Sequence, residues 1–528
     1  MDTTTGNSGK VIARRDALKG FALAGATLAA GGLLSGCQPS TKAEVNSSNS
    51  TPAAANIADV DWNGGEYDFV IVGAGGAGLG AALKAVEEGS SAVVLEYESG
   101  TGLSNTALCG GVMMACNTDV QREAGFEGDS IEEFKKYIDA VSADLAYTDL
   151  LHQWAERSTE VFEWVVDTGV SFPAEYLYYS GQEESYADAA KPYPRGHIAE
   201  GHVGSTITSA MEKAAVEKGA EFVFNTQVTN LFVDEEGTVV GVGTGKEAYK
   251  ANKAVILASG GFSRNEELLK NYIPDMIHGG SFGSSYQQGD AIKMGLEVGA
   301  KLGNMWAVQA KCTGTYLTDT SSPCNTVYSW GNPCVMVTED GVRKISEDTF
   351  YEEHYAFISS QPNSYTFIVW DQSVTDLGSD VLSVPPMSEG LKAETDAGTI
   401  YKADTYEELA KQMGVPEDAF AATMTRYNEM MNQGGQDLDL GREIGLGAVD
   451  TPPFYAAKLI PAICDTAGGL VVNTDYQVLN NNDEPIPGLY ATGAASAGWR
   501  GKYYCGSGTA VSYAIVSGRI AVESVLDV

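Results

Sequence analysis

The feature that most constrains this fold is a glycine-rich turn between two short apolar runs. Phe69–Val72 leads into Gly73, Gly75 and Gly78, spaced G-x-G-x-x-G, and a helical segment then leads to a second apolar run at 92–95. Glycines at this spacing permit a tight strand-to-helix turn, close approach of backbone N–H groups to a pyrophosphate, and close helix–strand packing. The pattern predicts a βαβ unit that binds a dinucleotide; the alternative is a purely structural turn.

An acidic residue ends the second apolar run, 23 positions after Gly73. This residue, Glu96, is placed to accept hydrogen bonds from a ribose 2′-OH. Its carboxylate would repel a 2′-phosphate, so it favours FAD or NAD over NADP. The N-terminal end of the intervening helix faces the phosphate charge. The predicted phosphate-binding turn consists of Gly73, Gly75, Gly76, Ala77 and Gly78.

Residues 1–36 have the features of an export signal. Arg14 and Arg15 precede a weakly apolar run at 20–36 that is too short for a membrane span. The arginine pair resembles the signal of proteins that are exported already folded, and Leu-Ser-Gly-Cys resembles a lipoprotein cleavage site with Cys37 as the lipidated residue. The alternative is an anchor helix that is never cut. In both cases we expect the body outside the cytoplasm, at the outer face of the membrane or in the periplasm.

Composition divides the rest of the chain. Residues 37–62 are rich in Ser, Thr, Asn and Ala and predict a flexible tether. Residues 63–304 and 451–528 are both rich in glycine, whereas 305–450 contain more aromatic residues, Pro and Cys. We therefore expect an α/β, Rossmann-like nucleotide-binding domain in two parts, split by an inserted α+β capping domain. Patterning also predicts strands at 221–228 and 254–258 and a closing helix at 510–525.

The formal net charge of the chain is −37 at pH 7. Such an acidic surface disfavours nucleic acid and anionic lipid headgroups as partners. It serves either solubility or, alternatively, docking of a basic electron carrier.

The cysteines and histidines indicate no metal or haem centre. The seven cysteines after Cys37 contain no haem-attachment or ferredoxin spacing, and the five histidines show no ligand spacing. Cys312, Cys324 and Cys334 could include a disulfide in an oxidising compartment.

In their order, these blocks resemble the FAD-dependent fumarate reductase / 3-ketosteroid dehydrogenase superfamily over essentially the whole mature chain. The resemblance implies an FAD-binding domain, with Glu96 at the adenosine ribose, Val228 at the adenine and the 105–111 loop along the isoalloxazine. A helix N-terminus near Ala510 would stabilise reduced flavin. The cofactor-binding residues implied beyond the turn are Glu96, Asn105, Thr106, Gly110, Gly111, Val228, Ala258, Gly260, Asp290, Gly493 and Ala510.

Two sequence blocks differ between the branches of this superfamily and therefore indicate the class of substrate. The first block is 341–351. Fumarate reductases have a catalytic Arg in this block, and this chain has no Arg at that position. Tyr351 occupies the position of the catalytic Tyr of ketosteroid dehydrogenases. In the block 500–508, Arg500 and Tyr504 replace the fumarate-type His and Arg. Tyr504 and Gly508 match the ketosteroid enzymes' Tyr-x-x-x-Gly. Exported gut-bacterial reductases of steroid-like enones and cardiac glycosides are similar at these positions.

The implied chemistry is hydride transfer from flavin N5 to an alkene conjugated to a carbonyl. Tyr504 O–H and Gly508 N–H would form the oxyanion pocket, and Tyr351 would protonate the α-carbon, unless it is only a packed aromatic. Arg500 either holds a substrate carboxylate or oxygen, or is a surface or flavin-edge arginine. A third family tyrosine would be one of Tyr176, Tyr178, Tyr179 and Tyr193.

The sequence shows no second nucleotide fingerprint, haem site or flavin-attachment domain, so we expect electrons from outside the chain, from a membrane-linked c-type cytochrome. The predicted function is an exported FAD-dependent oxidoreductase that reduces, or dehydrogenates, a C=C bond of a steroid-like or other enone. One alternative is a reductase of an unsaturated carboxylate (fumarate, acrylate or urocanate type), with Arg500 as anion anchor. The other is a lipoprotein that binds a ligand or flavin without turnover.

Overall fold

The apolar runs on either side of the glycine turn form neighbouring parallel strands. In the computed structural model, β1 (Gly65–Val72) pairs in parallel with β2 (Ala92–Leu95), and α1 (Gly76–Glu87) connects them. Residues 69–72 are buried on both faces of the strand. A strand of this kind needs cover on both sides, which helices provide in an α/β fold. The glycine turn therefore lies at the carboxyl end of β1.

Strands from distant parts of the chain complete this sheet. β8 pairs in parallel with the other side of β1, and β18, from near the C-terminus, pairs with β8. The order is β17-β18-β8-β1-β2-β5, with the β6–β7 hairpin attached to β8. The bounds are Glu221–Val223 for β5, Asn230–Val233 for β6, Val239–Gly243 for β7, Ala248–Leu257 for β8, Gln477–Leu479 for β17 and Pro485–Ala491 for β18. The predicted α/β class with a split nucleotide-binding domain is confirmed.

One predicted strand is shorter than expected. The apolar pattern predicts a strand over 221–228, but β5 ends at Val223. Asn225 adopts a left-handed conformation with φ 55°, and the N–H of Thr226 donates to the carbonyl of Glu96 at 2.8 Å. This bend carries the chain across the end of β2 and brings Val228 to the same edge of the sheet as the glycine turn.

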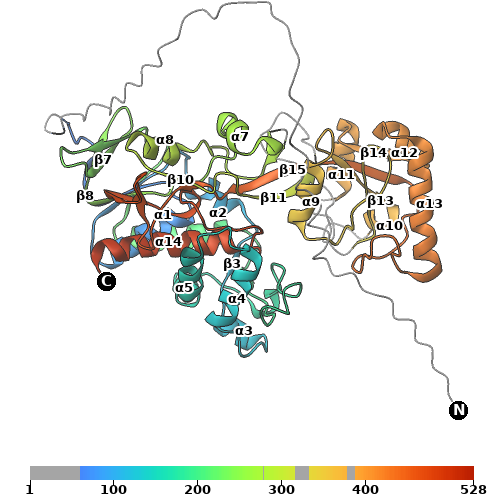
Figure 1. Ribbon diagram of the computed structural model, residues 1–528, viewed down its shortest axis with the longest axis horizontal. Helices are drawn as coiled ribbons and strands as arrows, with labels where there is room; N and C mark the ends of the chain where they lie inside the picture. The colour runs from blue at the N-terminus through green and yellow to red at the C-terminus, as the bar shows by residue number, and fades with distance from the viewer. Residues whose placement is uncertain (1–56, 58–59, 278, 315–331, 377–386) are drawn as a thin grey trace, which may run out of the picture. The chain divides into compact units, whose positions relative to one another are not determined.

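Small residues let the helices approach the sheet and one another closely. A side chain at Gly78 would place its Cβ 1.9 Å from the carbonyl oxygen of Gly73, and one at Gly518 would lie 2.0 Å from that of Ala77. The C-terminal helix α14 (Thr509–Leu526) consequently packs directly on α1 (Figure 1). It is long and apolar enough to cross a membrane, but two thirds of it is buried inside the protein. The other helices on this part are α4 (Ile131–Ser142), α5 (Thr148–Asp167) and α6 (Ser205–Glu217).

A second, mainly antiparallel sheet forms the capping part, in the order β11-β15-β13-β12, with β9 and β14 also paired to β15. Its strands are β9 (Gly280–Ser281), β11 (Val308–Gly314), β12 (Val335–Val337), β13 (Thr366–Asp371), β14 (Ile400–Ala403) and β15 (Phe454–Thr466). The limits of the domains stay a prediction. β15 nevertheless begins after residue 450 and pairs with cap strands, a partnership that composition does not reveal.

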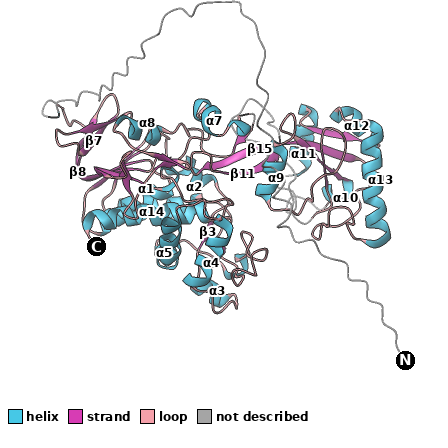
Figure 2. Cartoon of the chain, in the orientation of Figure 1, coloured by secondary structure: helices cyan, strands magenta, loops and turns pink. Residues whose placement is uncertain are grey.

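Helices cover both faces of this second sheet. Val335 and Val337 contact a cluster that includes Leu409 and Phe420, while Met336 contacts another that includes Ile358. This alternation is the two-residue period of a strand buried on both sides. The covering helices (Figure 2) are α9 (Tyr351–Ser359), α10 (Gln372–Thr375), α12 (Tyr406–Met413) and α13 (Glu417–Gly434).

The structure describes residues 57, 60–277, 279–314, 332–376 and 387–528. The predicted signal, Cys37 and most of the predicted tether lie outside these residues, as do Cys324 and the side chain of Cys312. Cys334 is a free thiol, so it does not take part in the disulfide considered above. Its buried sulfur instead contacts the guanidinium of Arg442 at 3.9 Å.

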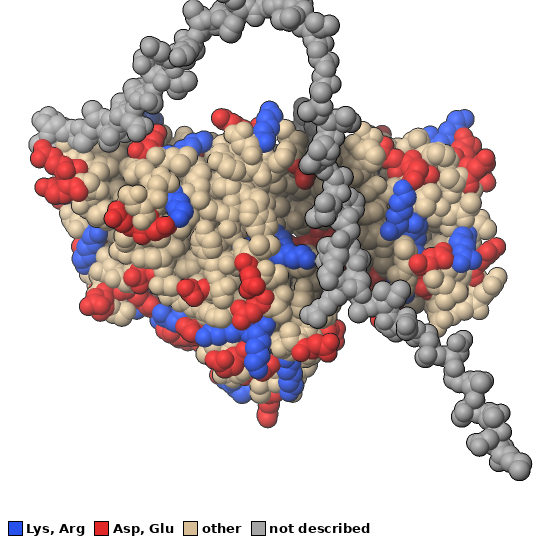
Figure 3. Space-filling model, in the orientation of Figure 1, with Lys and Arg blue, Asp and Glu red and all other residues tan. Residues whose placement is uncertain are grey.

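The face shown in Figure 3 has acidic side chains spread over it, with Lys and Arg side chains between them. Interspersed charges of both signs are typical of a soluble surface.

Candidate active site

A cavity of about 890 Å³ begins at the glycine turn and continues to the start of α14 and α9. Residues from both sheets line it, so distant parts of the chain build one site. The predicted site residues on its wall are Gly73, Gly75, Gly76, Ala77, Glu96, Asn105, Thr106, Gly110, Val228, Ala258, Gly260, Asp290, Gly493, Ala510, Tyr351, Tyr504 and Gly508. Gly78, Gly111 and Arg500, also predicted, are not on the wall.

The phosphate end of the cavity is formed by backbone. Gly73 has φ +106°, and a Cβ there would lie 2.5 Å from the carbonyl oxygen of Ala258, so the turn needs glycine. Gly75, the N-cap of α1, has no side chain to bond the first turn, and of the N–H groups there Thr106 accepts that of Gly76. The N-terminus of the helix is therefore left to bind an anion, which fits the pyrophosphate of a dinucleotide.

Glu96 stands at the adjoining end of β2. Its carboxylate accepts the N–H of Ala74 at 2.6 Å and the N–H of Glu98 at 2.8 Å, which fixes both oxygens beside the turn. Burial raises the pKa of this carboxyl, while these N–H donors act in the opposite direction. Each oxygen retains acceptor capacity, so a ribose hydroxyl fits here. Sequence reasoning missed Tyr97 and Tyr286, whose rings stack at 3.7 Å on the same wall.

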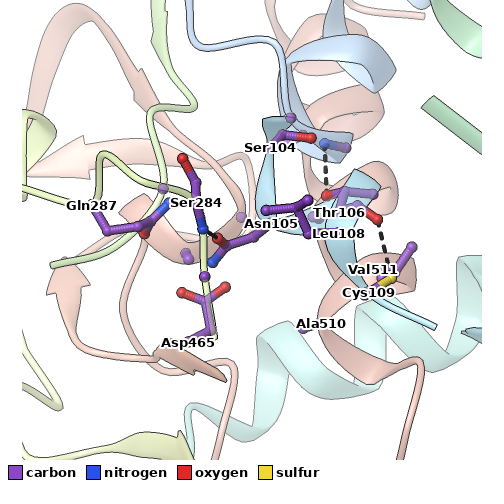
Figure 4. A pocket seen from close by; sticks show the side chains of 18 of the residues that line it. Ser104, Asn105, Thr106, Leu108, Cys109, Ser284, Gln287, Asp465, Ala510 and Val511 are labelled. Carbon is purple, nitrogen blue, oxygen red and sulfur yellow. Dashed lines mark hydrogen bonds between the residues drawn. The ribbon is translucent and has the colours of Figure 1, made fainter. Parts of the chain in front are cut away.

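The middle of the cavity is a network of short polar contacts around Asn105 and Thr106 (Figure 4). Asn105 accepts the N–H of Ser284 at 2.6 Å, and Thr106 accepts the N–H of Gly76 at 3.0 Å. Asp465 lies next to Asn105, and burial raises the pKa of its carboxyl to about 7. Sequence reasoning did not single out Asp465, because the strand pairing of β15 is what brings it here.

Tyr504 lies at the far end of the cavity and is 2% exposed. Its phenolic oxygen accepts the N–H of Ala510, in the first turn of α14, at 2.8 Å. Ala510, predicted as a cofactor-binding residue, lines the cavity, and its N–H is engaged by this phenol. Since the oxygen acts as acceptor, its own O–H proton remains available for another group. Burial raises the pKa of Tyr504 well above 10, so the phenol keeps that proton at neutral pH.

Gly508 provides a second donor next to this phenol. It is the N-cap of α14 with φ +97°, and a Cβ there would lie 2.7 Å from the amide nitrogen of Met114. Only glycine fits this conformation and this space. Among the described residues, the N–H of Gly508 has no hydrogen-bond partner. Two unused donors thus occupy the same end of the cavity.

Tyr351, the first residue of α9, also lines this cavity. Its hydroxyl is buried and finds no hydrogen-bond partner among the described residues. Burial raises the pKa of Tyr351 well above 10, with further increases from the nearby Glu352 and Tyr504. The phenol is therefore a proton donor and not a base at neutral pH. It packs partly against the core as well, so the packed-aromatic alternative describes its ring but not its unpaired hydroxyl.

Arg500 is placed differently from either expectation. It is 3% exposed, so it is not a surface arginine, and it does not line the cavity. Its Nη2 lies 2.9 Å from Oε1 of Glu352, which matches its charge. Gly78 serves helix–strand packing, and Gly111 faces the backbone of Val203. Gly78, Gly111 and Arg500 therefore pack behind the residues that line the cavity.

Among the four candidate third tyrosines, Tyr178 is the one that lines the cavity. Tyr179 is 39% exposed and Tyr193 is buried away from the wall. Sequence reasoning also missed Lys311, the one Lys or Arg on the cavity wall among the described residues. The Nζ of Lys311 lies 4.1 Å from the ring centre of Phe282. The available sequence signal was the alternation of side chains along β11, which places Gln309 and Lys311 on the same face of the strand.

The fold and this cavity define a dinucleotide-dependent oxidoreductase with proton donors opposite the nucleotide end. The FAD-binding-2 family (FAD binding domain) matches residues 68–511, so the chain belongs to this family. It is 28% identical over 562 residues to the digoxin reductase of Eggerthella lenta, an alignment that covers 97% of both chains.

Two solved structures extend the comparison. The open conformation of a flavocytochrome c3 fumarate reductase superposes with a TM-score of 0.72 at 29% identity, over 88% of this chain and 78% of that chain. A 3-ketosteroid-Δ4-(5α)-dehydrogenase from Rhodococcus jostii, in complex with 4-androstene-3,17-dione, superposes with a TM-score of 0.68 at 26% identity, over 89% and 99%. The predicted resemblance is confirmed, FAD is the cofactor, and the protein is an oxidoreductase of a family that acts on C=C bonds.

Proposed function

We propose that this protein is an exported reductase of a C=C bond conjugated to a carbonyl, in a steroid-like or other enone. The observation that carries the proposal is the meeting of three groups in one cavity. They are the free O–H of Tyr504, the free N–H of Gly508 and the unpaired phenol of Tyr351. Two donors suit an oxygen that gains charge, and the third suits a carbon that needs a proton.

When held by the glycine turn and Glu96, FAD would supply the hydride for the β-carbon of the alkene. The enone oxygen then carries the developing negative charge, and Tyr504 O–H and Gly508 N–H hold it. Tyr351 gives its proton to the α-carbon, so the alkene gains one hydride and one proton. The raised pKa of Tyr351 keeps the phenol protonated at neutral pH, which is the form that reduction requires. Run backwards, the same groups would dehydrogenate a saturated ketone.

Export and the electron donor are part of the same proposal. The twin arginine and the Leu-Ser-Gly-Cys sequence support export and a lipid anchor at Cys37. A membrane-linked c-type cytochrome would deliver electrons from outside the chain. The flavocytochrome among the similar structures supports a donor of this kind.

An anaerobic assay with reduced methyl viologen tests this function. We expect the FAD-loaded protein to oxidise the viologen with enones such as 4-androstene-3,17-dione, and to release a product with two more hydrogen atoms. Persistence of reduced viologen with every enone in a panel of steroid and aromatic ketones would refute the proposal.

A second candidate, reduction of an unsaturated carboxylate, is favoured by Lys311. Arg500, the expected anion anchor, is already paired with Glu352, whereas Lys311 makes no ion pair with any described residue and lines the cavity. Lys311→Met separates the candidates. For a carboxylate substrate, KM should rise strongly while neutral enones are unaffected. Equal kinetics of wild type and variant with fumarate, acrylate and urocanate would exclude Lys311 as an anchor.

A further inference from the structure

Glu352 connects the two segments that carry the catalytic phenols. It follows Tyr351 in the first turn of α9 and is 2% exposed. Its Oε2 accepts the backbone N–H of Tyr504 at 2.8 Å, and its Oε1 lies 2.9 Å from Nη2 of Arg500. One buried carboxylate thus joins the helix that starts with Tyr351 to the loop that leads to Tyr504.

This arrangement is a costly way to gain stability. Burial raises the pKa of Glu352, and the charge of Arg500 and the N–H of Tyr504 counteract that effect. Well-packed apolar residues in place of a buried ion pair are often equally stable. The contact that apolar residues could not reproduce is the hydrogen bond to the amide of Tyr504. Arg500 then has a specific task, which is to keep the acceptor ionised.

We infer that Glu352 is a positioning residue, which sets the Tyr504 phenol relative to Tyr351 and depends on Arg500 for its charge. The inference rests on the proposed function for its effect on turnover. It explains why Arg500 lies next to the site without lining the cavity. Neither residue touches the substrate in this account, and neither is used in the chemical steps above.

Two charge-neutral double variants test this role. In E352Q/R500M the ion pair is gone, but the glutamine oxygen can still accept the amide N–H of Tyr504. In E352L/R500M the ion pair is gone and no acceptor remains. Both variants remove the same charges from the same site, and they differ in whether side chain 352 offers an acceptor to the amide of Tyr504. FAD content and thermal unfolding establish that both are folded. If E352L/R500M does not fold, E352D, which keeps the charge on a side chain one methylene shorter, is compared with the wild type, which has the same charges.

The readout is the half-reactions measured separately by stopped flow. We expect E352L/R500M to be re-oxidised by the enone at least about tenfold more slowly than E352Q/R500M, and E352D at least about tenfold more slowly than the wild type, roughly the effect of 1.4 kcal/mol on a barrier. Reduction of the flavin by viologen should be equal in all of them, which a general structural defect would not produce. Equal re-oxidation rates in the variants with and without the acceptor would overturn the inference.

A binding probe keeps this test independent of turnover. 4-Chlorophenol, as its phenolate, presents an oxygen anion to the donors of Tyr504 and Gly508 and gives a long-wavelength absorption against oxidised flavin. We expect its Kd to be about tenfold higher in E352L/R500M than in E352Q/R500M, and about tenfold higher in E352D than in the wild type. If no enone re-oxidises the wild type, the proposed function fails, and this titration alone decides the role of Glu352. Equal Kd values would then refute it.

Discussion

Removing one hydroxyl group from the cavity should nearly abolish turnover and leave the fold intact. Tyr504→Phe keeps the ring, which packs against Trp499 at 6.3 Å between ring centres, and deletes the O–H that faces the cavity. The N–H of Gly508 remains, so the oxyanion pocket loses one of its two donors. One such donor contributes about 2.7–4 kcal/mol to the barrier, so we expect re-oxidation by a saturating enone to fall roughly 10²–10³-fold.

The same change has a limited effect on stability. The N–H of Ala510 loses the phenolic oxygen that it contacts at 2.8 Å. An unsatisfied buried N–H costs about 1–3 kcal/mol, and water in the cavity can replace part of the lost contact. FAD should therefore stay bound and thermal unfolding should shift by only a few degrees.

Stopped-flow re-oxidation of the viologen-reduced protein is the assay. Tyr476→Phe is the matched control, because Tyr476 is fully buried yet lies off the cavity wall, and this variant should react like the wild type. A Tyr504→Phe rate within about threefold of the wild-type rate would refute the oxyanion assignment, since that corresponds to less than 1 kcal/mol.

Three further predictions follow from the same wall. Gly508→Ala should lower both turnover and the unfolding temperature, because its Cβ would lie 2.7 Å from the amide nitrogen of Met114 at φ +97°; an unchanged melting curve would contradict this. Because burial raises the pKa of Tyr351 well above 10, turnover should show no loss from its ionisation up to about pH 10, and Tyr351→Phe should slow re-oxidation at every pH. Asp465 has a folded pKa of about 7 against an ordinary 3.8, so the folded state binds more protons between these values and the protein loses stability as pH rises through that window. Asp465→Asn should remove this loss in melting temperatures measured from pH 4 to 8, and an unaltered pH profile would show that Asp465 is not buried as described.

The nucleotide half of the site was predictable because its determinants are local. Backbone geometry at Gly73 and the chain position of Glu96 follow from spacing alone, and both line the cavity. The strand at 221–228 was overextended, since one left-handed residue, Asn225, redirects the chain and leaves no apolar signal.

The substrate half depended on partners that the sequence does not place next to each other. Arg500 was a reasonable anion anchor until its neighbour across the fold, Glu352, was known to be 2.9 Å away. Lys311 and Asp465 reach the wall through the pairing of β11 with β15, which single-strand patterns do not specify. The positions and partners of buried charged residues were therefore the features that could least be predicted from the sequence.

The central claim is that two donors and one phenol in this cavity direct hydride and proton to an alkene conjugated to a carbonyl. Anaerobic mixing of the viologen-reduced, FAD-loaded protein with an enone, in D₂O, tests it most directly by mass spectrometry of the product. We predict one equivalent of re-oxidised flavin per molecule of saturated ketone, with deuterium at both the α- and the β-carbon, because the phenol of Tyr351 and the nitrogen-bound hydrogen of reduced flavin both exchange with D₂O. Flavin that stays reduced, or a recovered enone without added hydrogen, would contradict the account.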